Sequence, residues 1–116
     1  MTSAIKIWLH EQYDRLRPQI ETERVRQIGE EGHTLDSDRG KGKQLRQAAL
    51  CYQRQALALD HTPGHLLTPA TLAAAGELWP WRSEFWKPTV DVDRNLVKAG
   101  ALMMAAVDAG LPKAGD

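Results

Sequence analysis

The chain has 116 residues, enough for one domain with a single hydrophobic core. Fifteen basic and fifteen acidic residues cancel to a formal net charge of zero, so no global field draws the chain to a nucleic-acid polymer or an anionic membrane. Any site for an anion must therefore be local. The single cysteine, Cys51, excludes an intramolecular disulfide, and the first residues lack a signal-peptide pattern. We expect a cytoplasmic protein.

The spacing of apolar residues predicts three helices in the first half of the chain. The first starts at its N-cap Ser3 and is ended or kinked by Pro18. The second covers residues 19–31, where apolar positions are sparse, so it is either a salt-bridged surface helix or one that turns a polar face to a site. A turn-rich loop over 33–42 follows, and an alanine-containing core helix is predicted over 43–59.

Two further helices are predicted in the second half. Thr68-Pro69 has the form of an N-cap followed by proline at the first helical position, and opens a short helix to about Gly76. Asp91 or Asp93 caps the last helix, which Gly110 stops. No segment alternates apolar and polar residues at a period of two, so we predict an all-α fold.

We expect a small bundle of about four helices with a Trp/Pro-rich lid, as one domain over residues 1–112 and a frayed tail over 113–116. Helical spacing predicts a shared core, formed by Trp8, Leu9, Leu16, Leu45, Ala49, Tyr52, Leu96, Gly100, Met103 and Val107. The alanine-rich helices and the lid leave more apolar surface than one small core covers, so we also expect a homo-oligomer.

Residues 79–88 hold three of the four tryptophans and the only phenylalanine. Two prolines in this segment exclude a long helix or a central strand. The segment is therefore either a lid that packs into the core or an aromatic surface for a ligand.

Aromatic and cationic side chains gather in and after this segment: Trp81, Trp86, Lys87, Arg94 and Lys98. Arg94 and Lys98 are four residues apart and are neighbours on one helix face. Aromatic planes beside paired cations suit a nucleobase carrying phosphates. The alternative is that the tryptophans pack the core while Arg94 and Lys98 form surface ion pairs with Asp91 and Glu84.

A second cationic region lies at the start of the 43–59 helix. Gly40-Lys41-Gly42-Lys43 lacks the length and the preceding strand of a phosphate-binding loop, but a helix N-terminus with lysines favours an anion. Arg24, Gln27 and Lys43 are therefore the alternative ligand-binding residues.

Five acidic residues and one histidine lie within sixteen residues, in the second predicted helix and the loop after it: Glu23, Glu30, Glu31, His33, Asp36 and Asp38. They could gather oxygen ligands for Mg²⁺, but a helical magnesium hydrolase needs a second acidic pair, and the core helix offers Lys43 and Gln44 there. His61 and His65 are separated by a helix-breaking Pro-Gly, which argues against zinc. We predict no metal, cofactor or catalytic residue, and leave enzymatic activity open.

Several blocks of the chain resemble a group of small phage and prophage proteins. They are Glu23-Arg24-Val25-Arg26-Gln27, Glu31-Gly32-His33-Thr34, Trp79-Pro80-Trp81, Phe85-Trp86-Lys87-Pro88 and Asn95-Leu96-Val97-Lys98-Ala99-Gly100-Ala101-Leu102. The resemblance covers residues 21–104 and implies a protein that acts in the cytosol of a host cell.

That group is in turn similar to the all-helical nucleoside triphosphate pyrophosphohydrolases, whose Mg²⁺ is held by carboxylates on packed helices. This sequence departs from that pattern in the loop, which adds cations in Asp36-Ser37-Asp38-Arg39-Gly40-Lys41, and at the following helix start, where Lys43-Gln44-Leu45 lacks a carboxylate. Such a change weakens a divalent metal site and strengthens an anion site.

The leading expectation is a phage-type protein that binds and sequesters an anionic, nucleotide-like ligand without turnover, for example a host nucleotide signal used in immunity. One alternative is a Mg²⁺-dependent nucleotide pyrophosphohydrolase, which needs the acidic residues to converge. Another is a protein-interaction module whose tryptophan segment docks a partner, which requires an exposed apolar patch without convergent cations.

Overall fold

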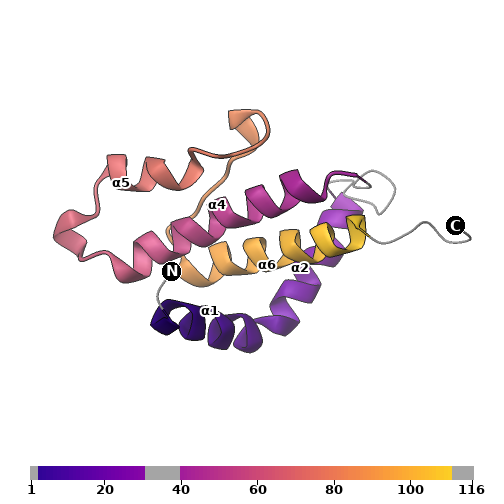
Figure 1. Ribbon diagram of the computed structural model, residues 1–116, viewed down its shortest axis with the longest axis horizontal. Coiled ribbons are helices and arrows are strands. Elements are labelled where there is room, and N and C mark those ends of the chain that lie inside the picture. Colours follow the sequence, from indigo (N-terminus) through magenta and orange to yellow (C-terminus); the bar gives the residue numbers. More distant parts are fainter. Residues whose placement is uncertain (1–2, 31–39, 111–116) are drawn as a thin grey trace, which may run out of the picture.

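The computed structural model describes residues 3–30 and 40–110, and these residues form an all-α fold without a strand (Figure 1). The helices are α1 (Ser3–Arg15), α2 (Arg17–Glu30), α4 (Gly42–His61), α5 (Pro69–Ala73) and α6 (Val92–Ala109). Three short 3₁₀ turns cover Gly64–Leu66, Ala74–Gly76 and Ser83–Phe85. The predicted fold class is therefore confirmed. The tail over 113–116 and most of the predicted loop lie outside the described residues.

Helices α4 and α6 form the central pair and pack along each other (Figure 1). Helix α2 packs across α6, and α1 lies against both α2 and α6. Helix α5 packs on α4 and leads into the tryptophan segment, residues 79–88, which returns to the start of α6. None of the helices in the described ranges is long and apolar enough to cross a membrane.

Local sequence signals set the helix ends. Helix α1 ends at Arg15 and α2 begins at Arg17, so Pro18 falls in the first turn of α2, where its missing N–H costs little. The Asp91 carboxylate accepts a hydrogen bond from the Arg94 backbone N–H at 3.2 Å, which makes Asp91 the N-cap of α6. Thr68 caps α5 in the same way through the Thr71 N–H, at 3.3 Å. These predicted ends are confirmed, and Asp91 is chosen over Asp93.

Small residues allow close packing in the core. Ala48 and Ala49 on α4 and Ala99 and Ala105 on α6 are fully buried where the central helices meet. On the other side of α6, the Ile20 side chain lies over Gly100, where an added Cβ would come within 2.6 Å of the Ile20 Cδ1 atom. A side chain at position 100 would therefore push α2 away from α6.

Most of the predicted core is buried, namely Leu9, Leu16, Leu45, Ala49, Tyr52, Leu96 and Gly100. Trp8 and Met103 are partly buried. The prediction is wrong for Val107, which is 68% exposed. Helix α6 is apolar over most of its circumference, so spacing alone did not define its buried face, which runs through Ala105 and Ala109 instead. Val25 on α2 is likewise 69% exposed, and the homo-oligomer that could cover such residues stays a prediction.

Candidate functional site

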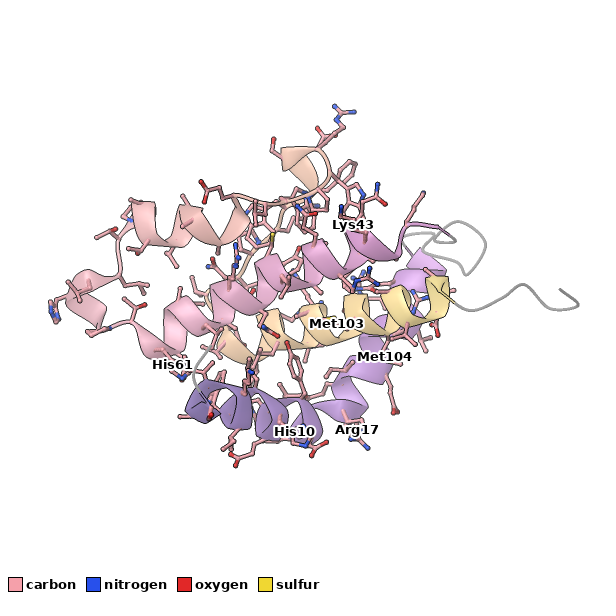
Figure 2. The ribbon with its side chains drawn as sticks, in the orientation of Figure 1. His10, Arg17, Lys43, His61, Met103 and Met104 are labelled. Atoms are coloured by element: carbon pink, nitrogen blue, oxygen red, sulfur yellow. The ribbon has the colours of Figure 1, made fainter. Side chains whose placement is uncertain are left out.

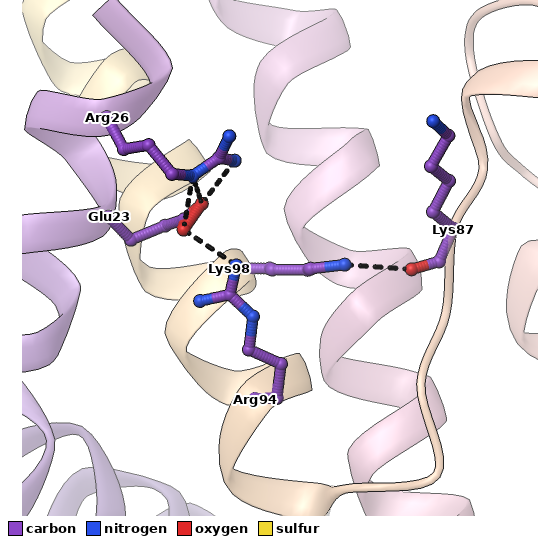
Figure 3. Close-up of polar contacts among 5 residues, drawn as sticks. All are labelled: Glu23, Arg26, Lys87, Arg94 and Lys98. Atoms are coloured by element: carbon purple, nitrogen blue, oxygen red, sulfur yellow. Dashed lines mark hydrogen bonds and ion pairs between the residues drawn. The ribbon is translucent and has the colours of Figure 1, made fainter. Parts of the chain in front are cut away.

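A buried carboxylate organises the polar face of α2. The Glu23 side chain is only 2% exposed and accepts hydrogen bonds from Arg26 Nε and Nη2, at 2.6–2.9 Å, one turn along the same helix. It also accepts one from Arg94 Nη2 on α6, at 2.9 Å (Figure 3). The sparse apolar pattern of α2 is thus explained by a polar face turned inward.

Burial by itself raises the pKa of the Glu23 carboxyl, but the hydrogen bonds and charges of Arg26 and Arg94 outweigh it and lower the pKa below its usual value. Glu23 is therefore ionised at neutral pH. Its carboxylate holds the Arg94 guanidinium by one nitrogen, and no hydrogen bond joins the Nε and Nη1 atoms of Arg94 to the rest of the described chain. Since the Arg94 side chain is 41% exposed, these donors can meet a ligand.

Lys98 and Lys87 join α6 to the end of the tryptophan segment. The Lys98 Nζ atom donates to the Lys87 carbonyl oxygen at 2.9 Å (Figure 3). The same atom lies 5.3 Å from the centroid of the Tyr52 ring. The Lys87 backbone N–H in turn donates to the Tyr52 hydroxyl at 3.3 Å. The backbone of the segment is therefore held between α4 and α6.

Three tryptophans gather around Tyr52. Trp86 packs on Tyr52 with a centroid separation of 4.7 Å, and Trp79 lies 5.1 Å from Trp86 and 5.3 Å from Trp81. Trp86 also covers Gly76, where an added Cβ would come within 2.8 Å of the Trp86 Cε2 atom. Trp79, Trp81 and Trp86 are all partly buried against the core between α4 and α6, so the segment serves partly as a lid.

A cavity of about 1080 Å³ opens between this segment and the polar faces of α2 and α6. This volume is slightly above the range of small-molecule sites, which span about 300–1,000 Å³. Aromatic residues form one part of its wall, namely Tyr52, Trp79, Trp81 and Phe85. Charged residues form another part, and among those that the structure describes Glu23 is the single carboxylate: Glu23, Arg26, Lys41, Arg82, Lys87, Arg94 and Lys98. Pro80, Gln27 and Leu102 are the other described residues of the lining.

Five of the eight predicted ligand-binding residues line this cavity: Gln27, Trp81, Lys87, Arg94 and Lys98. The other three do not. Arg24 has a nearly buried side chain and pairs with Asp108 at 3.4 Å. Lys43 is exposed at the start of α4 (Figure 2), and Trp86 is partly buried and packs on Tyr52.

The alternative in which Arg94 and Lys98 form ion pairs with Asp91 and Glu84 differs from the structure. Arg94 pairs with Glu23 instead, and Lys98 donates a hydrogen bond to a carbonyl oxygen. Sequence reasoning missed Glu23 and Arg26 as cavity residues. Their spacing of three on a helix with few apolar residues was the available signal. Tyr52 was assigned to the core, and it serves both the core and the cavity wall.

The structure describes only part of the predicted acidic cluster. Glu23 is engaged by two arginines, and the described residues contain no group of three or more His, Cys, Asp or Glu side chains that could hold a metal ion. The Glu30 side chain, Glu31, His33, Asp36 and Asp38 lie outside the part that the structure describes. The convergence that a pyrophosphohydrolase needs therefore stays a hypothesis.

Comparisons with protein-family models, curated proteins and solved structures gave no match. We therefore infer the function from the geometry of this site.

Proposed function

We propose that the protein binds an anionic, nucleotide-like ligand in the cavity between the tryptophan segment, α2 and α6. The observation that carries the proposal is the position of Arg94. Its guanidinium is held on one side by the buried Glu23 carboxylate, two of its nitrogens form no hydrogen bond to the described residues, and it lines the same cavity as Trp81.

The charges of the wall favour an anion. Within residues 3–30 and 40–110, six basic residues line the cavity against one carboxylate, and that carboxylate is already paired with two guanidiniums. Guanidinium groups present several N–H donors in a fixed plane that matches phosphate oxygens. A phosphate group at Arg94 would complete its hydrogen bonds without removing Glu23 from its partners.

The aromatic part of the wall favours a ring. Stacking of a nucleobase on an aromatic side chain contributes about 1–3 kcal/mol and needs no particular base. Trp81 is only partly buried and lies edge-on to Trp79, with interplanar angle 86°. Trp79 is itself fixed by a hydrogen bond from its Nε1 to the Arg82 carbonyl oxygen, at 3.1 Å. A supported aromatic surface next to cations is the arrangement that a nucleotide requires.

The proposal includes retention of the ligand without cleavage. At the start of α4 the chain carries Lys43 and Gln44, where the resembling hydrolases have a carboxylate that helps to hold Mg²⁺. The resemblance to phage proteins supplies a setting in which sequestering a nucleotide signal of the host would be useful.

A thermal-shift experiment with ATP, adenosine and inorganic triphosphate, each with and without Mg²⁺, tests the proposal. A ligand that binds only the native state raises the melting temperature by mass action. We expect ATP to raise the melting temperature more than adenosine or inorganic triphosphate does at equal concentration, because only ATP contacts both the aromatic and the charged part of the wall. No shift with ATP, or an equal shift with inorganic triphosphate, would contradict the proposal.

A further inference from the structure

Gln27 is a buried side chain whose polar atoms form no hydrogen bond within the part of the chain that the structure describes. The residue is 4% exposed and lines the cavity, and its amide oxygen is buried without a hydrogen-bond partner. Nor does a hydrogen bond join its amide nitrogen to the residues that the structure describes. Buried polar groups in proteins are nearly always paired, so an unpaired amide in a cavity wall indicates a partner supplied by a ligand.

The chemistry of the rest of the wall shows which partner is missing. The charged side chains of the wall that the structure describes are donors, apart from Glu23, whose carboxylate is occupied by two arginines. Phosphate oxygens only accept hydrogen bonds at neutral pH, apart from a residual proton, so they match the cations and cannot satisfy the Gln27 oxygen. The group that pairs with this oxygen must therefore be a donor on the nucleoside part of the ligand.

An amide offers one acceptor beside one donor in a plane. The last torsion of a glutamine side chain is broad, so rotation can present either atom or both to a ligand. This is the pairing by which glutamine recognises the adjacent amino group and ring nitrogen of adenine. Resting on the proposed function, we propose that Gln27 is a specificity residue that binds the edge of a nucleobase carrying an N–H donor next to an acceptor.

The test compares three triphosphates by titration calorimetry: ATP, 2′-deoxy-ATP and purine riboside 5′-triphosphate, which lacks the amino group of adenine. We expect purine riboside triphosphate to bind about tenfold more weakly than ATP, the usual effect of leaving a buried polar group unpaired. Deoxy-ATP should bind within about twofold of ATP, because the sugar hydroxyl is not the donor.

Two variants locate the effect. Gln27→Met keeps the length of the side chain and should abolish the difference between ATP and purine riboside triphosphate. Gln55→Met is the matched control, because Gln55 is also buried with an unpartnered amide oxygen but does not line the cavity. That variant should keep the full difference.

The outcomes separate this inference from the function on which it rests. Equal binding of ATP and purine riboside triphosphate by the wild-type protein overturns the role of Gln27 alone. A loss with deoxy-ATP as large as that with purine riboside triphosphate overturns it too, and assigns the donor to the ribose. Absence of binding by all three compounds overturns the proposed function and this inference together.

Discussion

Arg94 on α6 donates a 2.9 Å hydrogen bond to the Glu23 carboxylate on α2, which lies 71 residues away in sequence. The same carboxylate holds Arg26, so one buried acidic group fixes two guanidiniums at the edge of the cavity. Glu23 therefore has a structural role, as a link between helices, and a positioning role toward any anion that enters.

Replacing this carboxylate should cost stability. In Glu23→Gln, the two arginines lose an ionised acceptor, and we expect the free energy of unfolding to fall by about 1–3 kcal/mol. Urea denaturation at pH 7 measures the change. Glu11→Gln on the exposed face of α1 is the control and should differ little from wild type. An unchanged urea midpoint for Glu23→Gln would show that the ion pairs of Glu23 with Arg26 and Arg94 make no net contribution to the free energy of unfolding.

The same carboxylate predicts a pH dependence. Because the folded-state pKa of Glu23 is lowered, its contribution is fully present above the unfolded-state pKa, near 4.5, and is lost as the pH falls through the folded-state value. The stability difference between wild type and Glu23→Gln should therefore be largest near neutral pH and shrink below about pH 4.5. Unfolding curves recorded from pH 7 to pH 3 measure this trend, and a difference that grows on acidification would contradict the lowered pKa.

Arg94 should matter for ligand affinity more than for folding. A charge-assisted hydrogen bond is worth about 1.5–3 kcal/mol, so Arg94→Ala is expected to weaken ATP binding about tenfold to a hundredfold. Arg17→Ala removes a cation that pairs with Asp14 at the junction of α1 and α2 (Figure 2), away from the cavity lining, and should leave the affinity unchanged. An equal loss of ATP affinity in both variants would show that ATP responds to the overall charge of the protein and not to Arg94 in the cavity.

The lid depends on a glycine. In Gly76→Ala, the new Cβ would overlap the Trp86 indole, so the ring must move away from Tyr52, at a cost of about 1–3 kcal/mol. Near-ultraviolet circular dichroism and thermal unfolding report both effects. Gly64→Ala is the control, since no atom lies within 4 Å of its added Cβ. Unchanged aromatic dichroism in Gly76→Ala would mean that Trp86 is not held as described.

Local features of this fold could be predicted from the sequence. The caps at Asp91 and Thr68 and the break near Pro18 depend on residues within one helical turn, and the structure confirms them. The buried face of α6 could not be predicted in full, because its apolar residues surround most of the helix and only packing against α4 and α2 selects among them. Val107 was misplaced for that reason.

The candidate site could likewise be predicted only in part from the sequence. Trp81, Lys87, Arg94 and Lys98 are close in sequence, so their convergence could be predicted. The partner of Arg94 could not, because Glu23 belongs to another helix and no local rule connects the two. Arg24 and Gln27 are both nearly buried on α2, yet only Gln27 lines the cavity, a distinction that depends on how α2 lies against α6.

The central claim is that a nucleotide occupies the cavity beside the tryptophan segment. A crystal structure of the protein with ATP tests it most directly. We predict that the base lies against Trp81 and that phosphate oxygens are within hydrogen-bond distance of Arg94. A structure in which ATP at saturating concentration binds elsewhere on the molecule, or leaves this cavity empty, would contradict the proposed nucleotide site.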